Sequence, residues 1–106
     1  MDQRQDIKGR VRQFRDEAKQ LFPVKKVLLY GSHAKGSART DSDIDVAVVV
    51  DLPDHHNRID ITTALFHCAG QVDVCIETKC IFWDEYQNCE QGSILSEIKR
   101  AAIEIT

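Results

Sequence analysis

Apolar residues recur at helical spacing in the first part of the chain. Five of them are separated by steps of three or four residues: Ile7, Val11, Phe14, Ala18 and Leu21. This spacing places their side chains along one face of a helix. Pro23 cannot continue a helix because it lacks a backbone N–H. We therefore expect an amphipathic helix that ends near Pro23.

Short apolar runs predict three β-strands. Residues 27–30 and 44–50 are two such runs, and each fits a strand packed on a core. Residues 72–76 alternate instead, with valine and isoleucine on one face. Because strand side chains alternate between faces, Asp73 and Glu77 would share the other face.

Further helical segments are predicted around these strands. They cover residues 32–38, 57–69, 83–89 and the stretch from residue 94. Gly70 is expected to end the helix over 57–69, and residues 103–106 could instead finish as a strand. The apolar face of the last stretch packs within the domain or docks a partner, and we favour the first. Helices alternating with short strands predict an α/β or α+β fold with a mixed sheet.

Length and charge limit the function classes. With 106 residues, we expect a single domain over 1–106. Residues 1–26 hold eight Lys or Arg against four acids, and the rest of the chain holds six against thirteen, so the net charge of −3 is unevenly spread. The acidic remainder argues against tracking a phosphate backbone, which makes nucleic acid an unfavoured partner. The basic segment fits a solvated helix face or a partner of complementary charge.

The cysteines and the hydropathy pattern indicate an intracellular protein. The four cysteines form no Cys-x-x-Cys pair, which excludes a zinc ribbon or a dithiol redox motif. The sequence shows no signal peptide and no apolar run of membrane length. We expect a cytoplasmic protein with reduced thiols and no membrane association.

Two carboxylates at the start of a strand indicate a candidate metal-binding site. Asp43 and Asp45 are separated by one residue, so they project from the same face of the strand over 44–50. Upstream, Gly31 allows close approach of the backbone to a ligand, and the Ser32 hydroxyl with the following amides can hold an anion. Such a combination fits a nucleoside triphosphate with Mg²⁺. The alternative is a solvated loop whose aspartates cap helices.

A third acid is expected for two-metal chemistry. Asp73 is the candidate, because it would reach Asp43 and Asp45 if its strand lay beside theirs. Glu77 is the substitute, two residues after Cys75 on the same stretch. The alternative is an edge-strand aspartate that faces solvent.

Several residues between the glycine turn and the acids could contact phosphates. Lys35 and Arg39 are cations within reach of a triphosphate, and Gly36 fits the same pattern of turns. Ser42 is expected to shape the turn before the strand. His33 is expected to be exposed and chemically idle.

Residues 29–45, LYGSHAKGSARTDSDID, resemble the signature of the DNA polymerase β-like nucleotidyltransferases. They are most similar to the minimal nucleotidyltransferase domains encoded beside HEPN-domain proteins. The resemblance implies a small mixed sheet of three or four strands flanked by about four helices. It also implies Mg²⁺, two ions, and ATP as nucleotide donor.

The resemblance assigns roles to particular residues. It implies that Asp43, Asp45 and Asp73 bind metal and act in catalysis. It implies that a nucleotide contacts Gly31, Ser32, Lys35, Gly36 and Ser42. Many relatives carry arginine where this chain has Lys35, which lacks the two-pronged contact of a guanidinium.

The function implied is transfer of AMP from ATP to a hydroxyl of a partner protein. The expected partner is a HEPN-domain toxin, with this chain as its antitoxin. One alternative is a nucleotidyltransferase-fold module that binds and occludes its partner with little or no catalysis. Another is nucleotide transfer to RNA or a small molecule.

Overall fold

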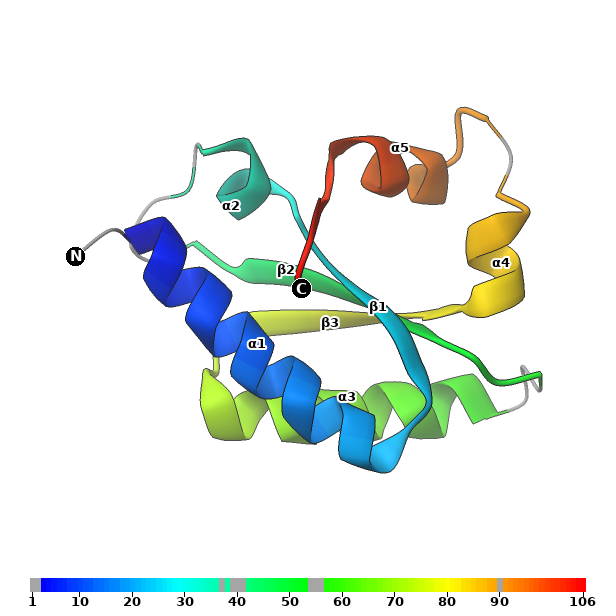
Figure 1. Ribbon diagram of the computed structural model, residues 1–106, viewed down its shortest axis with the longest axis horizontal. Helices are drawn as coiled ribbons and strands as arrows, with labels where there is room; N and C mark the ends of the chain where they lie inside the picture. The colour runs from blue at the N-terminus through cyan, green and yellow to red at the C-terminus, as the bar shows by residue number, and fades with distance from the viewer. Residues whose placement is uncertain (1–2, 37, 39–41, 54–56, 90) are drawn as a thin grey trace.

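A four-stranded sheet lies between two layers of helices in the computed structural model, which describes residues 3–36, 38, 42–53, 57–89 and 91–106 (Figure 1). The elements in chain order are α1 (Gln3–Leu21), β1 (Val24–Tyr30), α2 (Ser32–Lys35), β2 (Ile44–Val50), α3 (Arg58–Val72), β3 (Ile76–Phe82), α4 (Trp83–Gln87), α5 (Ile94–Ala101) and β4 (Ile103–Glu104). Figure 1 shows α1 and α3 on one face of the sheet and α2, α4 and α5 on the other. The predicted α/β architecture is therefore confirmed.

The sheet is mixed, with strand order β3-β2-β1-β4. β1 is antiparallel to both β2 and β4, whereas β2 and β3 are parallel. A parallel pair needs a crossover connection, and α3 supplies it. β4 confirms the expectation that residues 103–106 can finish as a strand, and it ends the sheet beside β1.

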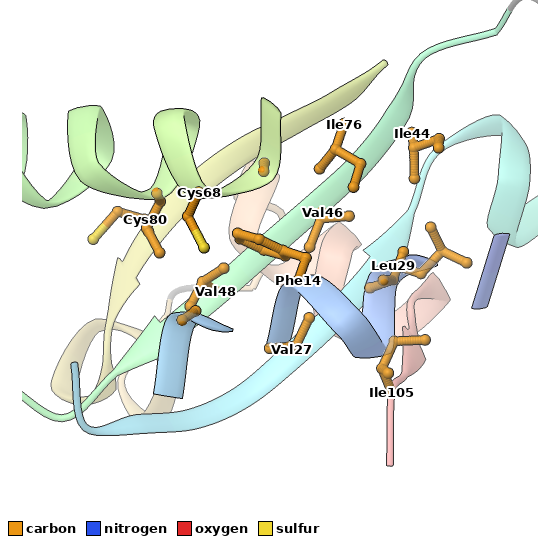
Figure 2. Packing of buried hydrophobic residues seen from close by; sticks show 14 of the residues in the cluster. Phe14, Val27, Leu29, Ile44, Val46, Val48, Cys68, Ile76, Cys80 and Ile105 are labelled. Carbon is orange, nitrogen blue, oxygen red and sulfur yellow. The ribbon is translucent and has the colours of Figure 1, made fainter. Parts of the chain in front are cut away.

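The larger core lies between the sheet and the pair of helices α1 and α3. Alternate β2 residues, from Ile44 to Val50, face it and are buried. Figure 2 shows the ring of Phe14 from α1 among Val27, Val46 and Val48. The other face of β2 contributes Ala47 and Val49 to a smaller cluster with α4 and α5. This alternation sends Asp45 to the α4 and α5 face of the sheet.

Most predicted elements are confirmed, but the predicted α3–β3 boundary is wrong. α3 runs through Gly70 to Val72, because Ala69 is buried and Val72 packs on the core. The strand expected over 72–76 does not form. The Asp73 carboxylate instead accepts the backbone N–H of Cys75 at 2.8 Å, which makes a local turn. The strand begins only at Ile76.

Within the described residues, no helix is both long enough and apolar enough to cross a membrane.

Candidate active site

The turn after β1 has a conformation that glycine permits. Gly31 has φ 73° and ψ −150°, in the region that residues with a Cβ rarely adopt. A Cβ at this position would overlap Oδ2 of Asp45 and lie 3.2 Å from its Cγ. The absence of a side chain at Gly31 therefore makes room for the Asp45 carboxylate.

Asp45 lies between two residues of neighbouring strands. Its register partner on β1 is Tyr30, and its partner on β3 is Glu77. Asp43 precedes β2 by one residue and is exposed. Asp43 and Asp45 flank Ile44 and are two residues apart, so their side chains lie on the same face. Asp43, Asp45 and Glu77 form the acidic cluster of this structure.

The acidic cluster concentrates negative charge. Burial raises the pKa of Asp45, and the charge of Asp43 raises it further, while His33 opposes the shift. The charge of Asp43 is the main cause that raises the pKa of Glu77, followed by burial and Asp45. Burial, with Asp45 and Glu77 nearby, also raises the pKa of Tyr30. The cluster thus favours a cation, which would relieve the repulsion.

Asp73 does not join Asp43 and Asp45. Its carboxylate binds Arg10 of α1, with 2.5 Å between Oδ2 and Nη1, on the face of the sheet opposite Asp45. The bond from the Cys75 backbone N–H, with help from Arg10, lowers the pKa of Asp73. The strand that was expected to carry Asp73 begins at Ile76, three residues after Asp73, and Glu77 occupies the position beside Asp45.

His33 is buried, contrary to the expectation of an exposed side chain. Its Nε2 lies 3.3 Å from the carbonyl oxygen of Ser42, as a hydrogen-bond donor would. This contact links α2 to the residues just before β2. Ser42 therefore shapes the approach to Asp43 through its backbone. A lone histidine in so short a helix gives no sign of such a contact in the sequence.

The residues expected to contact phosphate are partly gathered. Ser32 starts α2, and Gly36 ends it in a left-handed conformation with φ 78°. Lys35 is exposed and lines a pocket of about 400 Å³ on the Asp45 face of the sheet. The pocket is lined by Tyr30, Gly31, Lys35, Lys79, Ile94, Glu97, Ile98, Arg100 and Ala101. Arg39 lies outside the described residues.

Lys79 was not anticipated from the sequence. It follows Glu77 by two residues on β3 and therefore shares its face, with Ala47 as register partner on β2. The pocket is thus lined by Lys79 as well as Lys35 and Arg100, and Lys79 lies on the same strand face as Glu77 of the acidic cluster. Among the residues that the structure describes, no group of three His, Cys, Asp or Glu side chains is arranged to hold a metal ion by itself.

Comparison with known proteins defines the family. Residues 11–102 match the family model of the nucleotidyltransferase domain. The chain belongs to the nucleotidyltransferase domain family. This nucleotidyltransferase is 34% identical over 79 residues to a Methanocaldococcus jannaschii protein named "putative protein adenylyltransferase", across 68% of this chain and 78% of the relative.

A solved structure has the same fold. The match is the crystal structure of "a putative nucleotidyltransferase from Sulfolobus solfataricus", with a TM-score of 0.67 and 16% identity. It covers 95% of this chain and 80% of the other. At this identity the likeness concerns the fold, and it confirms the nucleotidyltransferase architecture expected from residues 29–45.

Proposed function

We propose that this nucleotidyltransferase transfers AMP from ATP to a hydroxyl group of a partner protein, with Mg²⁺ as the metal. The observation that carries the proposal is the position of Asp45, between Tyr30 and Glu77 and against the turn at Gly31. This arrangement brings carboxylates next to a turn suited to phosphate. The relative named as a protein adenylyltransferase supports a protein acceptor.

Asp43, Asp45 and Glu77 would supply the protein ligands of Mg²⁺, and because no three such side chains among the described residues are arranged to hold the ion by themselves, nucleotide phosphates and waters would complete its shell. Their carboxylate oxygens are the hard ligands that Mg²⁺ prefers. Burial and then the charge of Asp43 raise the pKa of Asp45, and chiefly the charge of Asp43 raises the pKa of Glu77, so a cation there would be favoured. The protein need not enclose the ion, because Mg²⁺ keeps waters and binds substrate phosphates. When bound, the metal lowers the pKa of the attacking hydroxyl and neutralises charge on the leaving pyrophosphate.

The residues around the pocket would orient the nucleotide. In this proposal Gly31 and Ser32 receive the triphosphate through backbone N–H groups and the Ser32 hydroxyl. Lys35 and Lys79 contribute positive charge against the phosphates. The apolar side of the pocket, from α5, gives the rest of the nucleotide a surface that excludes water.

The partner is proposed to be a HEPN-domain toxin in the cytoplasm, with this chain as the antitoxin. The support is the resemblance of residues 29–45 to the minimal nucleotidyltransferases that accompany such proteins. Modification of a hydroxyl by AMP adds bulk and negative charge, which can block a partner's active site.

The test is incorporation of labelled AMP into the protein encoded beside this chain, which the proposal expects to be a HEPN-domain protein. The purified proteins are mixed with labelled ATP and Mg²⁺. We expect Asp45→Asn and Glu77→Gln each to lower the labelling rate about a thousandfold or more, because each removes charge that holds the metal.

Asp73→Asn is the matched control, since it removes the same charge on the other face of the sheet. It should label at close to the parent rate. Full activity of Asp45→Asn would reject the proposal. Loss of activity in Asp73→Asn alone would mean that Asp73, rather than Glu77, is the third acid of the site. A stable complex without label would indicate that this chain blocks its partner by binding alone. Labelling of RNA or of a small molecule would mean that the acceptor is not a protein.

A further inference from the structure

An uncharged stripe runs along the outer surface of α3. Its members follow one another at steps of four, three and four residues: Ile59, Thr63, Phe66 and Gly70. The Ile59 side chain is 80% exposed and that of Phe66 is 62% exposed. At a helical period these positions lie far around the helix from Ile61, Leu65 and Cys68, which face the core. We call these four residues the α3 stripe.

The α3 stripe is suited to burial. The Thr63 hydroxyl donates to the Ile59 carbonyl oxygen at 2.9 Å, so its hydrogen is already satisfied and its methyl group is available for apolar contact. Above Gly70, a Cβ would meet nothing within 4 Å. The stripe thus presents two large side chains and two small positions, at the 3–4 spacing of a helix-pairing seam.

We propose that the α3 stripe binds the same stripe of a second copy of this chain, with the two helices antiparallel. In a two-fold symmetric pair the same patch meets itself. With the symmetry axis midway between Thr63 and Phe66, Ile59 of one copy meets Gly70 of the other. Phe66 likewise meets Thr63. Each large side chain therefore faces a small position, which allows close packing of the helices.

The polar side chains beside the α3 stripe agree with this register. Asp60 and His67 lie on the same flank, each one position beyond a stripe residue. The symmetry axis that pairs Ile59 with Gly70 brings Asp60 of one copy near His67 of the other. An imidazole N–H can donate to a carboxylate. The two-fold pair would therefore contain two such contacts, each between His67 of one copy and Asp60 of the other. A parallel pair would instead place this flank of the two copies on opposite sides of the seam.

The pairing leaves both active sites open. α3 lies on the sheet face opposite the pocket, which is lined by α5 and the turn after β1 (Figure 1). The proposal is therefore independent of the nucleotide chemistry. It adds an assembly of two catalytic units.

The test is the molar mass of the purified chain by sedimentation over a range of concentrations. One helix pair makes a small interface, so we expect a dimer with a dissociation constant on the order of 10 µM. Phe66→Glu should leave only monomer up to about 0.1 mM. Ile94→Glu is the matched control, because Ile94 is 76% exposed on the opposite side of the sheet, and its dimer should persist.

Three further variants test the register. Gly70→Leu fills the position that receives Ile59 and should weaken the dimer at least tenfold. Asp60→Lys should also weaken it, and Asp60→Lys combined with His67→Asp should restore it. Circular dichroism checks that each variant is folded. The proposal is overturned if the parent chain is monomeric at about 0.1 mM or if Phe66→Glu stays dimeric. The antiparallel register is overturned if the double variant, Asp60→Lys with His67→Asp, does not restore the dimer.

Discussion

Gly31 shows how one residue makes room for the carboxylate of Asp45. Its positive φ, and the overlap that a Cβ would make with Asp45, both require a residue without a side chain. We predict that Gly31→Ala lowers the AMP-transfer rate about a hundredfold, since displacing a catalytic group by about 1 Å has that effect. The free energy of unfolding should also fall by about 1–3 kcal/mol from backbone strain. Labelling assays and urea titrations measure the two effects.

Gly92→Ala is the control for backbone strain. Gly92 also has a positive φ, of 88°, but a Cβ there would meet nothing within 4 Å. This variant should lose stability and keep its transfer rate. Equal losses of rate in the two variants would mean that strain alone, rather than displacement of Asp45, explains the effect at Gly31.

At the scale of elements, Asp73 joins α1 to the turn between α3 and β3. Because its pKa is lowered in the folded state, the ionised carboxylate stabilises the protein at pH values above the unfolded pKa of about 3.9. This contribution is lost as the pH falls through the lowered pKa. We predict that Asp73→Ala reduces the free energy of unfolding by about 1–2 kcal/mol at pH 7. The difference from the parent should disappear in acid.

Denaturant titrations at several pH values measure this difference. Asp73→Asn is the control, because an amide oxygen can still accept the Cys75 N–H while the charge opposite Arg10 is gone. It should lose less stability than Asp73→Ala. A difference between Asp73→Ala and the parent that stays constant down to about pH 2 would contradict the role of the ionised carboxylate.

The sequence predicts elements well where a pattern is long, and poorly where two elements meet. The helix ending at Leu21 and the strand Ile44–Val50 have patterns that only one element fits. Residues 72–76 alternate over too few positions to distinguish a strand from a helix end followed by a turn. The Asp73 side chain, which accepts the nearby Cys75 backbone N–H, decides the outcome.

The same limit applies to the candidate site. Gly31, Ser32, Asp43 and Asp45 lie within 15 residues of one another, so local spacing is enough to group them. The acid contributed by β3 depends on the parallel register that pairs Asp45 with Glu77. α3 connects β2 to β3 and packs against β3, so the register depends on contacts between elements that the local sequence of β3 does not specify.

For the whole molecule, the two faces of the sheet differ in composition. The face covered by α1 and α3 holds the larger apolar core. The other face carries the acidic cluster, in which repulsion opposes folding. Stability supplied by the core on one face therefore allows an unfavourable concentration of charge on the other.

This division predicts a coupling between metal and stability. The pKa of Glu77 and that of Asp45 are raised in the folded state, so their ionised forms destabilise it, and stability returns as the pH falls through the raised pKa values. At neutral pH without Mg²⁺, Glu77→Gln should therefore have a higher Tm than the parent while losing transfer activity. Adding Mg²⁺ should raise the Tm of the parent more than that of Glu77→Gln, because a ligand that binds the folded state stabilises it. Thermal unfolding with and without Mg²⁺ measures these Tm values. If Mg²⁺ raises the Tm of both proteins equally, Glu77 does not bind the metal.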